Sequence, residues 1–278
     1  TTGAGVRYGI PVTETDTINL GLAYEATRVK VFDDSPLRFK EFVDEFGERN
    51  NTLRGDLGWA RDSRDSIFYP TKGRLQRVYG EIGLPGGDLT YYKLNYQHQW
   101  LKALTPQISV LLNGEFGYAG GYSGKELPFF NNFFAGGVSS VRGFKTGALG
   151  PKDTNGDAIG GTRRIIGNAE VLFPLPGTKE DKSFRLSLFV DAGTVYGKGE
   201  NLDLGKLRYS AGVGVNWFSP IGPIKLTFGV PIKKEKDDDI EQASRILRLL
   251  QIQSLREMQT VINETIVECQ NLITSEPK

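Results

Sequence analysis

The sequence is poor in the residues that most enzymes and disulfide-bonded proteins use. Its 278 residues include one histidine, His98, and one cysteine, Cys269. A lone cysteine cannot form an internal disulfide, so cysteine usage says nothing about the redox compartment. A single histidine without a nucleophile elbow offers no hydrolase triad, and it has no neighbours spaced like metal ligands. We therefore expect no enzymatic chemistry, no metal and no cofactor.

Excess charge and long apolar runs are also scarce. The 34 Lys and Arg residues nearly balance the 33 Asp and Glu residues, which argues against a nucleic-acid-binding surface over the whole protein and leaves local patches open. No run approaches the roughly 18 apolar residues of a membrane helix. The mean hydropathy is negative, but a transmembrane β-barrel hides its hydrophobicity in every second residue. Periodicity must therefore decide the class.

Alternation of apolar and polar residues is abundant over most of the chain. One segment sets Tyr209, Val213 and Trp217 on one face against Arg208 and Ser210 on the other. Ten such segments are bounded by turn residues. We predict strands over 2–10, 17–31, 51–62, 73–83, 89–101, 107–120, 164–173, 184–196, 207–218 and 224–230.

These segments are long enough to cross a bilayer, which takes about nine to eleven tilted residues, and aromatic residues recur near their ends. A soluble β-sandwich also alternates, but it rarely keeps strands of this length with Tyr and Trp at both ends. We therefore predict an all-β fold, an antiparallel transmembrane β-barrel. Short turns at 11–16, 85–88, 102–106 and 221–223 are expected at one end, and long polar loops at 33–49 and 121–161 at the other.

The pattern changes after residue 233. Residues 234–242 form a charged stretch, and apolar residues then recur at helical spacing as far as Ile273. The predicted organisation is a barrel portion over 1–233 with the inserted loop 121–161, a linker over 234–242, and an amphipathic helix over 243–278. Such a helix needs a partner helix, so the tail is expected to self-associate or to dock as a coiled coil.

Two motifs in the long loop carry a family resemblance, and other blocks support it in the same order. The motifs are Phe134-Ala135-Gly136-Gly137 and Val141-Arg142-Gly143-Phe144, and the blocks include Asn168-Ala169-Glu170 and Val190-Asp191-Ala192-Gly193. Over about residues 2–242 the sequence resembles the Omp85 superfamily. The resemblance implies a sixteen-stranded barrel of the bacterial outer membrane, with this chain matching the sixth to the fifteenth strand.

The resemblance also implies a function, the assembly and insertion of β-barrel proteins into that membrane. The partners it implies are outer-membrane lipid, client β-barrel proteins and lipoproteins of the assembly machinery. The tail separately resembles the C-terminal helix of the RNA transcription, translation and transport factor family, through residues 245–250 and 255–264. Two lineages in one chain suggest a chimera or a fused gene product, and the strands missing from the sixteen suggest a fragment of the barrel. Two alternatives stay open: a scaffold that binds through the tail, and a protein-secretion pore of the same superfamily.

The candidate site is centred on Arg142. A guanidinium carried into a barrel keeps its charge and needs carboxylates. Glu170 and Asp191 lie on polar faces of their strands, and the resemblance pairs the signature arginine with acidic residues at these two positions. We predict a cluster of all three that pins the loop tip to the inner wall. The alternative is a solvated Arg142 with two ordinary lumen carboxylates.

The neighbours of Arg142 have predicted supporting roles. Gly143 is expected to let the backbone approach the wall, and Phe144 to pack beside it. The resemblance adds Val141 to the signature and Phe134, Gly136 and Gly137 as support for the loop.

Overall fold

In the computed structural model, the described residues are 1–67, 69–175, 184–219 and 222–241. Residues 1–240 form one compact unit built on a single sheet of ten strands. The strands are β1 (Thr2–Pro11), β2 (Asp16–Arg28), β3 (Arg49–Asp62), β4 (Gly73–Leu84), β5 (Tyr91–Ala103), β6 (Ser109–Gly121), β7 (Arg163–Pro174), β8 (Phe184–Tyr196), β9 (Arg208–Ser219) and β10 (Gly222–Lys233). The short helices are α1 (Leu37–Phe46), η1 (Phe129–Asn131) and η2 (Leu204–Lys206).

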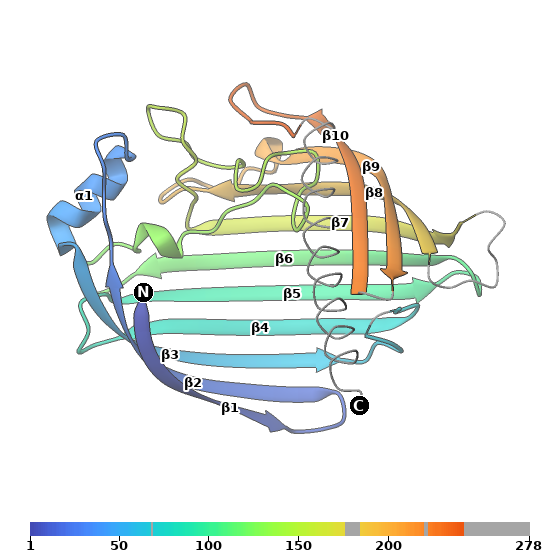
Figure 1. The fold of residues 1–278 in the computed structure, drawn as a ribbon, viewed down its shortest axis with the longest axis horizontal. Coiled ribbons are helices and arrows are strands. Elements are labelled where there is room, and N and C mark those ends of the chain that lie inside the picture. The colour runs from blue at the N-terminus through green and yellow to red at the C-terminus, as the bar shows by residue number, and fades with distance from the viewer. Residues whose placement is uncertain (68, 176–183, 220–221, 242–278) are drawn as a thin grey trace, which may run out of the picture. The chain divides into compact units, whose positions relative to one another are not determined.

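Each strand pairs antiparallel with its neighbours in the sequence, so the spatial order is β1 to β10 without a crossover. This confirms the predicted antiparallel β fold and its ten strands. Figure 1 shows the sheet curving from β1 round to β10. Within the part of the chain that the structure describes, β1 pairs only with β2 and β10 only with β9, so these strands do not close a ring.

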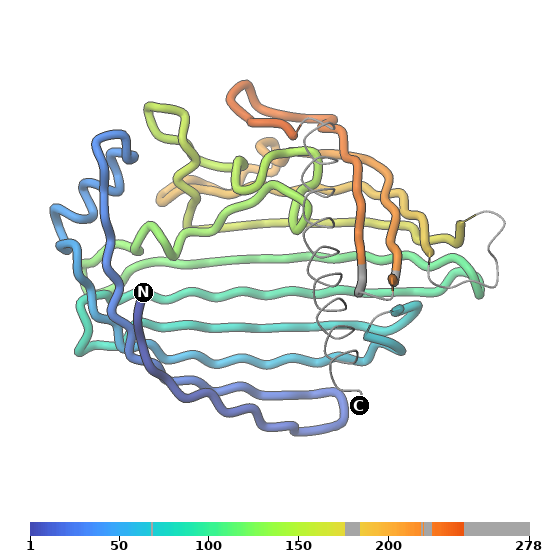
Figure 2. The backbone as a smooth tube through the Cα atoms, in the orientation of Figure 1, coloured from blue at the N-terminus to red at the C-terminus, as the bar shows by residue number. Residues whose placement is uncertain are grey.

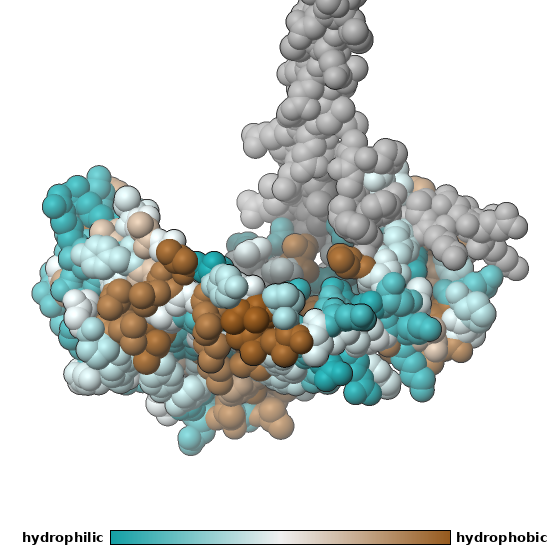
Figure 3. Space-filling view, turned by 90° about the horizontal axis from the view of Figure 1, so that it is seen from below, coloured by the Kyte–Doolittle hydropathy of each residue, from teal (hydrophilic) through white to brown (hydrophobic). Residues whose placement is uncertain are grey.

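The two faces of the sheet differ as the alternation predicts. One face, the outer face, exposes large apolar side chains on every strand, among them Val6, Leu57, Leu188 and Val230. Figure 3 shows such side chains gathered into broad apolar patches. Polar side chains alternate with them on the inner face. A sandwich would bury its apolar face, so the outward apolar face rules out the sandwich alternative.

The connections depart from the prediction in two places. The turn at 85–88 lies at the same end of the sheet as the long loops. A hydrogen bond shows its position: the amide of Asp88 donates to the carbonyl of Asn51 at the start of β3, where the segment 33–49 ends. The segment 33–49 is not an open loop but contains α1, whose apolar residues Phe39, Phe42 and Phe46 recur at helical spacing. The ring of Phe42 packs edge-on against Phe129 of η1.

The connection between β6 and β7, residues 122–162, folds back over the inner face of the sheet; we call it the inserted loop. Figure 2 shows its backbone doubling over the strands that follow it. Its residues Phe133, Val141, Phe144 and Leu149 are almost fully buried and make up much of the hydrophobic core. The core of this unit therefore lies between the loop and the wall.

The predicted helix over 243–278 lies outside the described residues. None of the helices in the described ranges has both the length and the apolar character needed to cross a bilayer.

Candidate functional site: the anchored loop tip

Two adjacent strands supply the acidic side chains of the site. β7 and β8 pair so that Asn168 faces Asp191 and Glu170 faces Phe189, and all four side chains lie on the inner face. Because side chains alternate along a strand, Asn168 and Glu170 project in the same direction two residues apart. The register thus places both carboxylates under the inserted loop.

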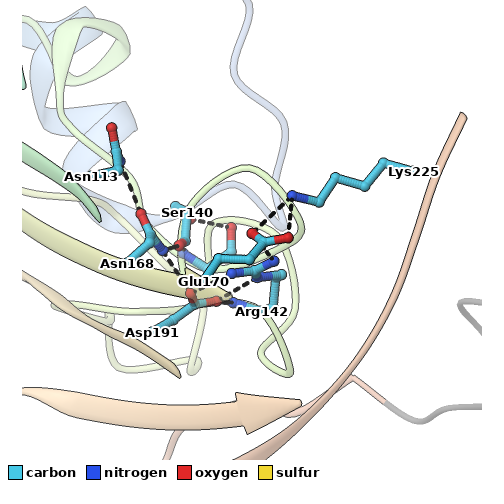
Figure 4. Close-up of polar contacts among 8 residues, drawn as sticks. Asn113, Ser140, Arg142, Asn168, Glu170, Asp191 and Lys225 are labelled. Carbon is cyan, nitrogen blue, oxygen red and sulfur yellow. Dashed lines mark hydrogen bonds and ion pairs between the residues drawn. The ribbon is translucent and has the colours of Figure 1, made fainter. Parts of the chain in front are cut away.

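Arg142 lies between these carboxylates (Figure 4). Its Nε and Nη2 donate to Oδ2 and Oδ1 of Asp191, both at 2.7 Å, and its backbone amide donates to Oδ2 at 3.0 Å. Its Nη1 donates to Oε2 of Glu170 at 3.1 Å. Two parallel bonds from one guanidinium to one carboxylate fix direction as well as distance. The structure therefore brings together the three residues of the predicted cluster.

Further polar groups complete the network. Asn168 donates from Nδ2 to Oδ1 of Asp191 at 2.8 Å and to the carbonyl of Ser140 in the loop at 2.7 Å. Lys225 of β10 reaches Glu170, with its Nζ 3.1 Å from Oε2. The two cations, Arg142 and Lys225, balance the two carboxylates, so the cluster is formally neutral. A neutral, hydrogen-bonded cluster is the form in which buried charges are tolerated.

The three central side chains of the cluster are almost inaccessible to water, whereas that of Lys225 is 49% exposed. The side chains of Arg142, Glu170 and Asp191 are 5%, 4% and 0% exposed. Burial alone would lower the pKa of Arg142, but the hydrogen bonds and charges of Asp191 and Glu170 outweigh it and raise that pKa. The guanidinium also stacks on the ring of Phe189, with its central carbon 3.4 Å from the ring centroid. The surroundings of Arg142 therefore keep its guanidinium charged and fix its position.

Backbone meets backbone where the loop tip reaches β10. Gly143 has φ +89°, and a Cβ there would lie 2.9 Å from the carbonyl oxygen of Gly229. On the other side, a Cβ at Gly229 would lie 3.0 Å from the backbone of Arg142 and Gly143. A side chain at either position would separate the loop from the wall. The next residue, Phe144, is fully buried in the core.

The paired glycines before the signature form the turn that presents it. Gly136 and Ser140 exchange hydrogen bonds, the amide donating to Oγ at 2.8 Å and Oγ to the carbonyl at 2.9 Å. The amide of Gly137 donates to the carbonyl of the buried Val141 at 3.1 Å. Phe134 lies away from the cluster and is 36% exposed. It contributes its carbonyl, which accepts from Nη1 of Arg164 at 3.3 Å.

Lys225 and Phe189 are members of the site that the sequence prediction did not include. Both lie on the inner face by the alternation of their strands, so position along the strand was an available signal. Neither belongs to a recognisable motif. A lumen-facing lysine is also common in barrels, so its pairing with Glu170 needs the three-dimensional arrangement.

The site holds charges of opposite sign in fixed positions. Within residues 1–67, 69–175, 184–219 and 222–241, no group of three or more His, Cys, Asp and Glu side chains is arranged to hold a metal ion. The acidic turn at Asp153 uses its carboxylate to accept the amides of Asn155 and Asp157.

Known proteins are similar to this chain in sequence and in fold. The Omp85 superfamily domain matches residues 1–245, a range that includes every described residue. The chain belongs to the Omp85 superfamily. It is 39% identical to the outer membrane protein assembly factor BamA of Neisseria meningitidis serogroup B, over 87% of this chain and 35% of that protein. It is 31% identical to the sorting assembly machinery 50 kDa subunit of Saccharomyces cerevisiae, over 70% of this chain and 42% of that protein.

A solved Omp85 structure shows the same fold. The crystal structure of BamA from Haemophilus ducreyi lacking POTRA domains 1–3 superposes with a TM-score of 0.80 at 29% identity, covering 86% of this chain and 52% of that one. The ten strands are therefore part of the wall of an Omp85 transmembrane β-barrel, and the chain is a protein of the bacterial outer membrane. This Omp85 chain spans between about a third and two fifths of the length of the relatives named here.

Proposed function

We propose that the chain takes part in the assembly and insertion of β-barrel proteins into the bacterial outer membrane. Its relatives from Neisseria and yeast are named as an assembly factor and as a sorting assembly subunit. The structural observation that carries the proposal is the inserted loop, whose arginine is fixed to two carboxylates of the wall. A passive wall would not require a buried, charged anchor of this kind, because burying ions costs free energy unless each is paired.

The proposed partners follow from the two faces of the wall. The outer face, with its exposed apolar side chains, contacts outer-membrane lipid. Client β-barrel proteins are the substrates, and their unpaired strands would add to a strand edge through main-chain hydrogen bonds. Lipoproteins of the assembly machinery are proposed as further partners. The Arg142 anchor would keep the lumen filled and the wall rigid while a client strand pairs.

Folding of a client barrel tests the proposal. The full chain is reconstituted in vesicles of outer-membrane lipid, a urea-unfolded client barrel is added, and its folding is followed by heat-modifiable mobility on gels. We expect faster folding than in empty vesicles and loss of the gain in Arg142→Ala. The matched control is Asp157→Asn, an exposed residue of the same loop. Folding no faster than in empty vesicles would refute the proposed function.

A further inference from the structure

A second set of contacts holds the inserted loop beyond its tip. It comes from residues 234–240, which follow β10; we call this segment the strap. The carboxylate of Asp239 lies 3.2 Å from Nζ of Lys145 and 3.2 Å from Nζ of Lys152. The backbone amide of Lys145 donates to the carbonyl of Asp239 at 3.0 Å, and Ile240 forms an antiparallel bridge with Phe144. The strap therefore binds both backbone and side chains of the loop.

The strap is in turn fixed to the wall. Asp238 accepts two hydrogen bonds from Arg208 of β9, at 2.9 and 3.1 Å. These side chains are 2% and 10% exposed, so the pair is nearly as buried as the Arg142 cluster. Nη1 of Arg208 also donates to Thr194 of β8 at 2.9 Å. A forked, buried ion pair fixes the orientation of the strap as well as its position.

The two anchors hold different parts of the loop. Arg142 fixes the tip, but the chain continues through a positive-φ turn at Gly147 before it reaches Lys152. Within this stretch the amide of Ala148 bonds to the carbonyl of Lys145, and the amide of Leu149 to the carbonyl of Ala135. These bonds are internal to the loop. Residues 144–152 also reach the wall through apolar contacts, since Phe144 and Leu149 lie in the core and a Cβ at Gly150 would lie 2.8 Å from Cβ of Val195 in β8. The strap adds hydrogen bonds and ion pairs to these contacts.

We propose that the strap is a second, independent anchor that holds residues 144–152 of the inserted loop against the wall. Asp238 and Asp239 are then positioning residues, the first for the strap and the second for the loop. The inference goes beyond the proposed function because it concerns the position of the loop whether or not a client protein is present. It also gives a role to an acidic segment that the sequence pattern presents as a solvated linker.

Amide hydrogen exchange of the full chain in lipid vesicles, without a client, tests the proposal. In Asp238→Asn, which leaves Arg208 buried without its carboxylate, we expect the peptide covering 144–152 to exchange about tenfold faster or more. Peptides of β5 and β6 are expected to keep their rates. The matched control is Asp237→Asn, because this exposed side chain forms no ion pair with any residue in the described ranges.

A charge exchange at the exposed contact makes the test independent of folding defects. Asp239→Lys is expected to speed exchange of 144–152 because it opposes two lysines, and adding Lys145→Asp and Lys152→Asp is expected to restore slow exchange. Wild-type rates in both Asp238→Asn and Asp239→Lys would overturn the proposal. So would failure of the charge exchange to restore protection while β5 and β6 stay protected. Client folding is not measured, so this outcome is separate from failure of the proposed function.

Discussion

Arg142 and Lys145 lie three residues apart in one loop and each pairs with an aspartate, yet the two contacts differ in burial and in hydrogen-bond geometry. Arg142 and Asp191 are 5% and 0% exposed and join through two 2.7 Å bonds. Lys145 and Asp239 are 45% and 49% exposed and meet once, at 3.2 Å. The first pair is further supported by the ring of Phe189 and by the backbone amide of Arg142. The second pair is further supported only by the backbone amide of Lys145.

The difference shows that burial, more than charge, decides what each contact contributes. Breaking a buried pair strands an ion in a low-dielectric site and costs about 3–5 kcal/mol. Breaking an exposed pair costs about 0–1 kcal/mol, because water replaces the lost partner. The loop therefore has a tip that opens rarely and a following segment whose outermost contact opens readily. The predictions below run from the larger effect to the smaller.

Removal of the guanidinium should have the largest effect. In Arg142→Ala, Asp191 loses the two hydrogen bonds from the guanidinium and keeps the one from the backbone amide, and we expect the free energy of opening of the loop tip to fall by about 3–5 kcal/mol. Arg142→Lys should recover little of it, because an ammonium cannot form the fork or stack on Phe189 in the same way. The measurement is amide exchange of the peptide covering 138–144. Arg77→Ala, at an exposed position of β4, is the control; an equal effect there would contradict the prediction.

The two carboxylates should differ in importance. Asp191 accepts three hydrogen bonds from Arg142 and Glu170 accepts one. We therefore expect Asp191→Asn to cost about 3 kcal/mol of tip protection and Glu170→Gln about 1.5 kcal/mol, on the scale of hydrogen bonds to charged groups. The same exchange measurement compares them side by side. A larger loss in Glu170→Gln would show that Lys225, rather than Arg142, organises the cluster.

The exposed contact between Lys145 and Asp239 should respond weakly to mutation and clearly to salt and pH. Lys145→Met is expected to lower the free energy of opening of residues 144–152 by at most about 1 kcal/mol. In about 1 M salt, most of the difference in exchange rate between the variant and the wild type should disappear. Hydrogen bonds from Lys152 and Lys145 lower the pKa of Asp239 from its ordinary value of 3.8. Because the pKa of Asp239 is lower in the folded state, its carboxylate stabilises the contact fully at pH values above the ordinary pKa. That stabilisation is lost as the pH falls through the lowered pKa.

Exchange in 144–152, corrected for the intrinsic rate, should therefore be flat from neutral pH down to about pH 4 and rise only below it. The tip peptide is the internal control, since its buried anchor should ignore salt. A salt response at the tip equal to that at 144–152 would remove the distinction between the two contacts.

Much of the fold could be predicted because side-chain alternation is a local property. The segment 184–196 was predicted with the limits that β8 has, and the other strands within a few residues. The helix α1 was missed because charged residues between Phe39, Phe42 and Phe46 gave the segment the appearance of a polar loop. The turn at 85–88 was assigned to the wrong end of the sheet because it is short. The end at which a turn lies is set by the number of strands before it, not by its length.

The site was predictable to the extent that motifs and strand faces define it. Alternation put Glu170 and Asp191 on inner faces, and the resemblance linked them to Arg142. No local signal could link Lys225 to Glu170, because the two are joined only when β10 curves round to face β7. The strap contacts have the same origin: Asp238 and Arg208 are distant in sequence, and an acidic run by itself is typical of solvated linkers.

The bare backbones of Gly143 and Gly229 face each other with no side chain between them. Two glycines far apart in the sequence thus form one backbone contact, and a methyl group on either would push the two backbones apart. Substitution at one cannot be relieved by change at the other, since neither has atoms left to give up. A side chain at either position would therefore separate the loop tip from β10, whatever happens to the charges beside it.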